Sequence, residues 1–207
     1  MTTVYFLRHG ITEQNKEGRI QGQLPGKISL VGTERYLAAI TPLLRDKNPQ
    51  VLISSDLKRA VETRKMLGNF LQLPNPREAA MPLLREKAMG FYEGMLWSEV
   101  PMEFKEQQKK AHYDFRKYGG ENEEDVRKRV REALRKIGKE YPNSRVACVT
   151  HAGWLRQLGQ LDNQEGVLPD GWTNRTAIYE GSLDSEGKLY SFRPIDIEAG
   201  VDVEEEE

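Results

Sequence analysis

The sequence of 207 residues contains one cysteine and no long apolar run. Because the single cysteine, Cys148, lies in the apolar segment 146–149, a disulfide within the chain is impossible and a thiol-rich metal site is excluded. No apolar run approaches the roughly 20 residues that cross a bilayer, and the N-terminus lacks the basic and apolar regions of an export signal. We therefore expect a soluble, cytoplasmic protein without a membrane partner.

An excess of charge of one sign is also missing. The sequence has 31 Lys and Arg residues against 32 Asp and Glu residues, which gives a formal net charge of -1. No global field attracts nucleic acid, so we expect no nucleic-acid partner and only local binding of anions. The length and the lack of internal repeats predict a single domain over residues 1–207, with a disordered acidic tail over about 203–207.

Three segments share one pattern, in which a short apolar run ends in polar or glycine residues and a helical pattern follows. The apolar runs cover residues 4–7, 51–53 and 146–149, and a Ser or Asp of 54–56 is available as the N-cap of the helix after the second run. Such alternation predicts an α/β fold, a three-layer sandwich with a mostly parallel central sheet and helices on both faces. Two further strand-like runs, 177–183 and 188–192, indicate a hairpin that adds an antiparallel edge.

Other helical patterns lie between these units. An apolar stripe predicts a helix over 123–140, and its basic residues between 127 and 139 are interpreted as a solvated face. A second pattern covers 36–44, where Pro42 is expected to kink or divide the helix. The polar segment of about 99–120 has the weakest core pattern, and we interpret it as an excursion from the sheet and a candidate cap over the site.

Notable side chains lie at the ends of the three predicted strands. His9 and His151 each follow a buried strand and precede a glycine, and Arg8 and Arg59 belong to the same strand-helix units. In open α/β sheets, ligands bind at the carboxyl ends of the strands. Each residue alone is more often a structural group or a surface ion pair, but four at equivalent places indicate a site.

These residue types suit phosphoryl chemistry. Arginine presents a planar fork to phosphate oxygens, which suits Arg8 and Arg59 to a phosphoryl group. Neutral imidazole is a nucleophile, and if His9 attacks phosphorus, its second ring nitrogen needs an acceptor such as a backbone carbonyl. A carboxyl group in a partly apolar pocket should protonate the leaving oxygen. Residue types alone leave both Glu86 and Glu93 as candidates for it.

The segment 8–15 resembles the opening motif of the histidine phosphatase superfamily, the phosphoglycerate mutase-like group with Arg-His-Gly. Later segments resemble the other motifs of the family and follow in the same order. Residues 21–22 and 30–32 resemble the loop that follows the opening motif, and the other four motifs cover 54–63, 84–94, 119–121 and 150–153. An ordered set of five motifs is far more specific than a lone Arg-His-Gly.

The resemblance implies a metal-independent phosphatase that hydrolyses a small phosphomonoester, such as a sugar phosphate or a similar metabolite. It implies that His9 becomes phosphorylated and that Glu86 protonates the leaving alcohol and then activates water. No metal and no cofactor are implied. The other implied residues hold the phosphoryl group or lie near the substrate, and they are Arg8, Arg59 and His151, then Asn15, Gln21 and Gly22.

Other functions stay open at this point. A cofactor-dependent phosphoglycerate mutase would return the phosphoryl group to its substrate, although the short excursion favours hydrolysis. A non-catalytic phospho-ligand binding module would be expected to lose His9 or Glu86, and both are present. The segment 85–94 is also similar to phosphatases acting on fructose bisphosphate. Basic and aromatic residues of the excursion suit a second phosphate, but a solvated amphipathic helix is the favoured interpretation.

Overall fold

In the computed structural model, a six-stranded sheet forms the centre of the molecule, and the structure describes residues 1–109, 112–161 and 177–195. The strand order is β3-β2-β4-β1-β5-β6. The parallel strands are β1 (Thr2–Arg8), β2 (Val51–Ser54), β3 (Arg77–Ala80) and β4 (Arg145–Thr150). The antiparallel edge is formed by β5 (Ile178–Leu183) and β6 (Leu189–Ile195). The mixed sheet confirms the prediction, although β3 was not predicted because its mostly exposed residues give no apolar run.

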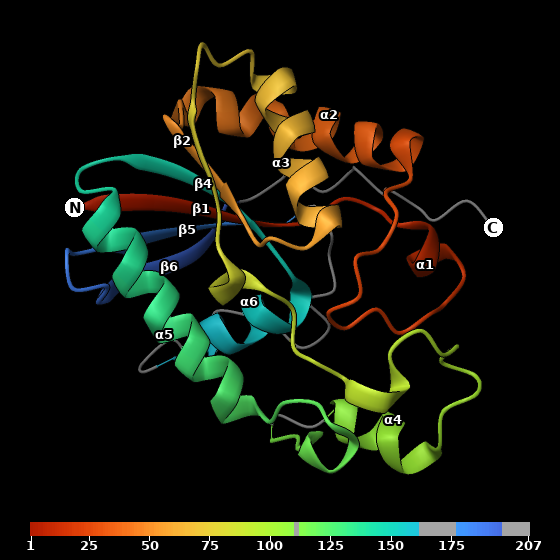
Figure 1. Cartoon of the computed structure of the whole chain (residues 1–207). Helices are drawn as coiled ribbons and strands as arrows, with labels where there is room; N and C mark the ends of the chain where they lie inside the picture. The colour runs from red at the N-terminus through yellow and green to blue at the C-terminus, as the bar shows by residue number, and fades with distance from the viewer. Residues whose placement is uncertain (110–111, 162–176, 196–207) are drawn as a thin grey trace.

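Helices cover both faces of the sheet, which confirms the three-layer sandwich (Figure 1). The covering helices are α2 (Leu30–Lys47) and α3 (Lys58–Leu71) on one face, and α5 (Glu123–Glu140) and α6 (Ala152–Gly159) on the other. Successive side chains of a strand point to opposite faces. Tyr5 and Leu7 of β1 accordingly pack in the α2 and α3 core, and Val4 and Phe6 pack in the α5 and α6 core.

Shorter elements lie outside the sheet. They are α1 (Glu13–Lys16), α4 (Met102–Lys109) and the 3-10 turns η1 (Pro82–Leu84), η2 (Gly90–Tyr92) and η3 (Arg116–Tyr118). Segment 89–118 forms a third hydrophobic cluster around Phe104, Tyr113 and Phe115, joined by Ile20 from the loop after α1. We call segment 86–118 the cap segment. Its aromatic side chains give it a small core of its own.

The helix boundaries test two sequence expectations. Helix α5 coincides with the predicted helix, and Asn122 begins it with a capping box to Asp125. Helix α2 runs through Pro42 as one helix, so of the two expected outcomes, a kink or a division, the division does not occur. Pro42 lies on the exposed side, where the carbonyl of exposed Ala38, which loses its donor, can bind water.

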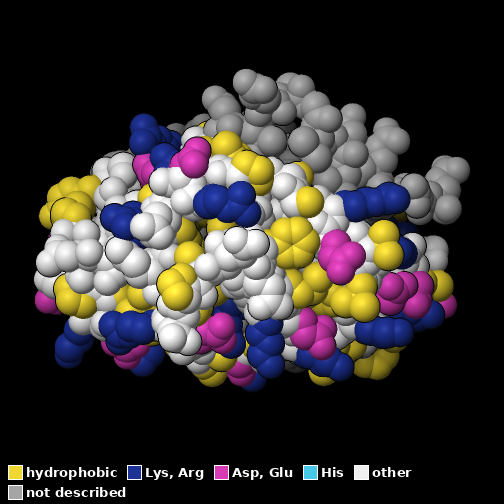
Figure 2. Space-filling model, turned by 90° about the horizontal axis from the view of Figure 1, so that it is seen from above, with side chains coloured by type: hydrophobic (Ala, Val, Ile, Leu, Met, Phe, Trp, Pro, Cys, Tyr) yellow, Lys and Arg dark blue, Asp and Glu magenta, His cyan; other side chains and the backbone are white. Residues whose placement is uncertain are grey.

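The described part of the chain contains no helix that is long and apolar enough to cross a membrane. On the face that carries α2 and α3, Lys and Arg side chains are interspersed with Asp and Glu side chains (Figure 2). Charge of one sign does not gather on that face, in keeping with the balanced composition. The acidic tail expected over 203–207 lies outside the described residues.

Candidate active site

The carboxyl ends of β1, β4 and β2 meet at one edge of the sheet, and each is followed by a polar residue. His9 follows β1, and its amide donates to the carbonyl of Thr150 in β4 over 2.9 Å. Ser55 follows β2, and its amide donates to the carbonyl of Val149 over 3.1 Å. Strand register therefore brings together residues that are far apart in the sequence, as predicted from the three strand-helix units.

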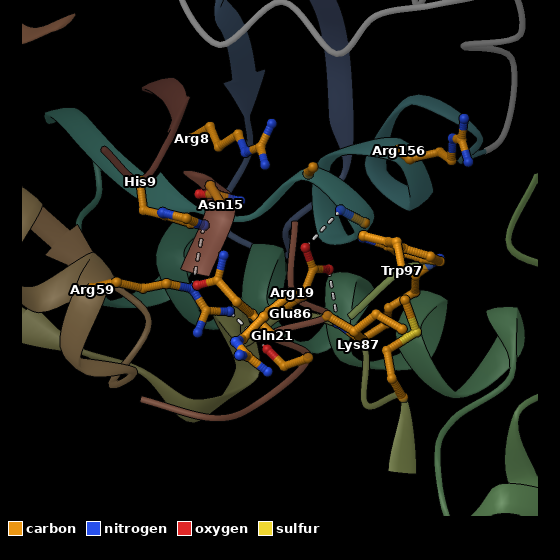
Figure 3. A pocket seen from close by; sticks show the side chains of 15 residues that line it. Arg8, His9, Asn15, Arg19, Gln21, Arg59, Glu86, Lys87, Trp97 and Arg156 are labelled. Carbon is orange, nitrogen blue, oxygen red and sulfur yellow. Dashed lines mark hydrogen bonds between the residues drawn. The ribbon is translucent and has the colours of Figure 1, made fainter. Parts of the chain in front are cut away.

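A cavity of about 420 Å³ opens at this edge (Figure 3). Its size suits a small metabolite. Seven of the eight residues expected at the site line it, namely Arg8, His9, Asn15, Gln21, Gly22, Arg59 and Glu86. The eighth, His151, does not. Five cationic side chains and a single carboxylate belong to the lining, so the cavity favours anions although the whole chain is nearly neutral.

The ring of His9 is oriented by the backbone. His9 is 4% exposed, and its Nδ1 lies 2.7 Å from the carbonyl oxygen of Gly10. Because a carbonyl can only accept, Nδ1 carries the proton and the lone pair lies on Nε2. The Nε of Arg59 donates to this Nε2 over 3.3 Å. The acceptor expected for the second ring nitrogen is therefore present, and Nε2 faces a guanidinium group.

Arg59 is held in place by a loop. It lies in the first turn of α3 and is 1% exposed. Its Nη2 donates to the carbonyl of Gly22 over 2.7 Å, and its Nη1 donates to the carbonyl of Leu24. Burial lowers the pKa of Arg59 to about 10, while the charges of Glu86 and Glu93 oppose this shift. The side chain therefore stays cationic near pH 7.

Glu93 binds the same loop, which contains Gly22, Gln23 and Leu24. Its Oε1 accepts hydrogen bonds from the amide of Gln23 over 3.0 Å and from the amide of Met89 over 2.9 Å. Gly22 has a φ of +47°, and a Cβ there would collide with the Glu93 carboxylate. Glu93 does not line the cavity, whereas Glu86 does. The geometry therefore favours Glu86 over Glu93 as the acid.

Glu86 presents its carboxylate from the cap segment. Oε1 accepts from the amide of Lys87 over 2.8 Å, and Oε2 accepts from the amide of Gly153 at the start of α6 over 3.1 Å. The Glu86 carbonyl accepts from Nε2 of Gln23 over 3.1 Å and from Arg129. These bonds fix both the backbone and the side chain of Glu86 beside the cavity.

Arg129 and Glu121 support the segment that carries Glu86. Arg129 donates to the carbonyls of Leu83 and Arg85 and pairs with Glu121, which accepts from the amide of Ala88 over 2.8 Å. The expectation that the basic residues of α5 are solvated is therefore wrong for Arg129, which is about one-fifth exposed. One signal was available, since Arg129 directly precedes Val130 of the apolar stripe.

His151 lies one layer behind His9. It is fully buried, the two ring centroids are 5.0 Å apart, and its Nε2 lies 2.6 Å from Oγ of Ser55. Burial lowers the pKa of His151 well below its usual value, and the charges of Arg59, His9 and Arg8 add to this. His151 is therefore neutral near pH 7, and its Nδ1 is buried without a hydrogen-bond partner.

Two polar residues expected at the start of α3 serve the site instead. Leu57 occupies the N-cap position without a side-chain hydrogen bond, Ser55 contacts His151, and Asp56 accepts two hydrogen bonds from Arg85 at 2.6 and 2.7 Å. Arg85 in turn contacts Gln23 of the loop that holds Arg59. The expected N-cap was therefore wrong, because these side chains are used between segments that are distant in the sequence.

Asn15 lies at the site, whereas the basic residues of the excursion named below do not line the cavity. Asn15 closes the capping box of α1 with Thr12 and lines the cavity. The exposed side chains of His112, Arg116 and Lys117 instead form ion pairs with acidic residues, which are Glu123, Asp114 and Glu103. No group of three or more His, Cys, Asp and Glu side chains suited to a metal occurs among the described residues.

Comparisons with known proteins identify the family of this chain. The sequence profile of the histidine phosphatase superfamily (branch 1) matches residues 4–165. The chain is 32% identical over 166 residues to a metal-independent phosphoserine phosphatase of Arabidopsis thaliana, with 76% of this chain and 67% of that protein covered. It is 29% identical over 163 residues to a glucosyl-3-phosphoglycerate phosphatase of Mycobacterium tuberculosis, with 74% and 71% covered.

A solved structure gives the same result. The mycobacterial glucosyl-3-phosphoglycerate phosphatase in complex with VO3 superposes with a TM-score of 0.73 at 26% identity, covering 93% of this chain and 96% of that chain. Sequence, fold and relatives thus agree. The chain belongs to branch 1 of the histidine phosphatase superfamily and is a phosphoric monoester hydrolase.

Proposed function

We propose that this chain is a metal-independent phosphatase that hydrolyses small phosphomonoesters through a phosphohistidine at His9. The observation that carries the proposal is the orientation of the His9 ring, with Nδ1 bound to the Gly10 carbonyl and Nε2 left as the nucleophile. This nitrogen lies in a cavity with five cations and one carboxylate. The phosphatases among its relatives support the same chemistry.

The first half-reaction joins phosphorus to His9. Nε2 attacks the phosphorus atom, and the bond to the leaving oxygen breaks as that oxygen takes a proton from the Glu86 carboxyl group. Arg59 donates to Nε2 in the free protein. Once Nε2 bonds to phosphorus, this N–H loses its acceptor and is available to a phosphoryl oxygen. Arg8 and Arg59 stabilise the charge that develops on these oxygens.

The second half-reaction restores the protein. The Glu86 carboxylate takes a proton from a water molecule, the water oxygen attacks phosphorus, and the bond between phosphorus and Nε2 breaks. Inorganic phosphate leaves, Nε2 regains its lone pair, and Glu86 is again protonated. In this scheme His151, a neutral ring whose centroid lies 5.0 Å from that of His9, holds the phosphoryl group together with Arg8 and Arg59, and Asn15, Gln21 and Gly22 shape the phosphate pocket.

We also propose that the chain acts as one domain, with the excursion of about 99–120 as a cap at the site, and that it works in the cytoplasm. The third hydrophobic cluster supports the cap, because its members Ile20 and Met89 also line the cavity. The buried thiol of Cys148, which forms no disulfide, suits a reducing compartment.

The proposal is tested by two substitutions. His9→Ala should lower the release of phosphate from p-nitrophenyl phosphate roughly a thousandfold or more, because it removes the nucleophile. Glu86→Gln should slow alkyl phosphates more than p-nitrophenyl phosphate, because a poor leaving group depends most on the acid. His112→Ala is the matched control, since His112 is exposed and does not line the cavity.

Two further measurements separate this proposal from its rivals. Activity should survive EDTA, and loss of activity that added metal restores would overturn the metal-independent mechanism. With 3-phosphoglycerate, free phosphate should form faster than an isomerised product. If isomerisation dominates, the chain is a mutase. If His9→Ala keeps wild-type activity, the phosphohistidine is wrong.

A further inference from the structure

Lys87 lines the cavity although it is only 3% exposed. Its Nζ lies over the ring of Tyr113, 4.2 Å from the centroid, and 5.5 Å from the ring centroid of Phe115. The structure records no hydrogen bond or ion pair from this Nζ to any described residue. A buried ammonium group without an acceptor is unfavourable, since ring faces replace only part of its lost hydration.

The nearest carboxylate does not satisfy this charge. The two oxygens of Glu86 accept from the amides of Lys87 and Gly153, and no ion pair joins them to Nζ. Burial lowers the pKa of Lys87 to about 8, with the charge of Arg156 adding and that of Glu86 opposing. Lys87 thus remains mostly cationic at pH 7 and still lacks an anionic partner.

Arg156 lines the same end of the cavity. It projects from α6 and is half-buried, and the structure records no hydrogen bond or ion pair from it to any described residue. Figure 3 shows Lys87, Trp97 and Arg156 toward one end of the cavity and Arg8, His9 and Arg59 toward the other. A third cation, Arg19, is paired with Glu17 and contacts the Gly94 carbonyl. Its charge is therefore partly compensated.

The cavity holds more positive charge than one phosphoryl group requires. Arg8 and Arg59 match the phosphoryl group at His9, which leaves Lys87 and Arg156 without an anion beside the apolar wall of Trp97. We infer that Lys87 and Arg156 form a subsite for a second anionic group, a carboxylate or a second phosphate, on the substrate. The inference rests on the proposed function at His9, which fixes where the ester phosphate lies.

The test uses two pairs of substrates that differ in one anionic group. 3-phosphoglycerate and glycerol 3-phosphate differ by a carboxylate, and fructose 1,6-bisphosphate and fructose 6-phosphate differ by a phosphate. In at least one pair, the wild-type kcat/KM should favour the member with the second anion about tenfold or more, as expected for charge-assisted hydrogen bonds. The pair that shows the preference identifies the second anion.

Lys87→Met and Arg156→Gln should each lower that preference about tenfold, mainly through KM. Lys87→Arg should keep most of it. Lys139→Met, on the exposed side of α5 and outside this cavity, is the matched control and should not change the ratio. Arg156→Gln alters a half-buried residue, so it tests the subsite even if Lys87→Met fails to fold. An unchanged ratio in folded variants, or no preference in either pair, overturns the subsite.

A binding arm separates this inference from the proposed function. Calorimetric titration of His9→Ala protein with the same four compounds reports affinity without turnover. If the wild-type protein hydrolyses no phosphomonoester, the proposed function fails. The subsite still stands if the compound with two anions binds more tightly and Lys87→Met removes the difference. Equal affinities of both members in both pairs overturn the subsite whether or not the chain is a phosphatase.

Discussion

The two ends of the cavity hold their charges in different ways. At the His9 end, Nδ1 of His9 and both Nη atoms of Arg59 are bound to backbone carbonyls, and Nε of Arg59 donates to Nε2 of His9. At the Lys87 end, the ammonium group rests on aromatic faces and has no recorded acceptor among the described residues. The first arrangement fixes reacting atoms in advance, which favours one chemistry on many substrates. The second leaves charge for a ligand, which favours selection among substrates.

The two ends also come from different parts of the fold. His9 follows a central strand whose register is fixed on both sides, and the start of α3 positions Arg59. Lys87 comes from the cap segment, which packs around its own small cluster. On the proposed function, the sheet edge and α3 position the nucleophile and Arg59, whereas the cap segment contributes the acid Glu86 and, with Arg156 of α6, the cations that select what is attached to the phosphate.

Removing the two hydrogen bonds that Glu93 accepts should give the largest expected loss of activity, and this loss arises at the His9 end of the cavity. Glu93→Ala frees the amides of Gln23 and Met89, so the loop that binds Arg59 should loosen. We expect kcat/KM for every phosphomonoester to fall about tenfold to a hundredfold, mainly in kcat. The loss should be the same for good and poor leaving groups, unlike that of Glu86→Gln, because Glu93 positions other residues and does not itself transfer the proton.

The conservative variant distinguishes positioning from general destabilisation. Both hydrogen bonds go to one oxygen, Oε1, so Glu93→Gln can keep both acceptor contacts and should restore most of the activity. Glu99→Ala is the matched control, since Glu99 also caps a backbone amide in the cap segment but lies away from Arg59. A loss in Glu93→Ala that grows with leaving-group pKa would instead make Glu93 the acid.

The His9 end could be predicted from the sequence because each residue lies at the end of a recognisable strand. His9, Arg59 and His151 each follow an apolar run, and parallel strands bring such ends together. The side chains behind them could not be assigned. Ser55 and Asp56 fit a local N-cap pattern, yet they contact His151 and Arg85, and no periodicity encodes contacts between such distant segments.

The Lys87 end was missed for the same physical reason. A lysine after a glutamate in a charge-rich chain is most often solvated. Its burial depends on Tyr113 and Phe115, which contact its ammonium group although they lie more than 25 residues later in the sequence, after α4. The polar composition of residues 99–120 concealed these aromatic contacts. Sequence patterns predicted the excursion but not the lysine side chain that its aromatic residues cover.

The pH dependence of substrate preference sharpens the comparison further. With a pKa of about 8, Lys87 loses its proton above that pH, so the preference for a second anion should decline there. Groups facing Lys87 are Glu86, Arg156 from α6, and Tyr113, whose pKa is raised by burial so that it stays neutral. The kcat/KM ratio of each substrate pair, measured from pH 6.5 to 9.5, cancels titrations that both members share.

We expect this ratio to fall toward the value for Lys87→Met as the pH rises through about 8, a change of up to roughly tenfold. In Lys87→Arg the ratio should stay level over the same range, because guanidinium keeps its charge. A decline of the same size in Lys87→Arg would assign the titration to another group.

The smallest expected effect concerns stability at the His9 end. The pKa of His151 is well below its usual value of about 6.5 in the folded protein, so only the unfolded chain binds this proton as the pH falls below that value. The unfolding free energy should therefore decrease with falling pH, by at most about 1.4 kcal/mol per pH unit from this group.

Urea unfolding at pH 7.5, 6.0 and 5.0 gives the slope of the unfolding free energy against pH, which should be shallower in His151→Gln. His112→Gln, which replaces an exposed histidine that contacts Glu123, is the matched control. Parallel curves for wild type and His151→Gln would mean that His151 is protonated in the folded protein, and the neutral ring behind His9 would have to be abandoned.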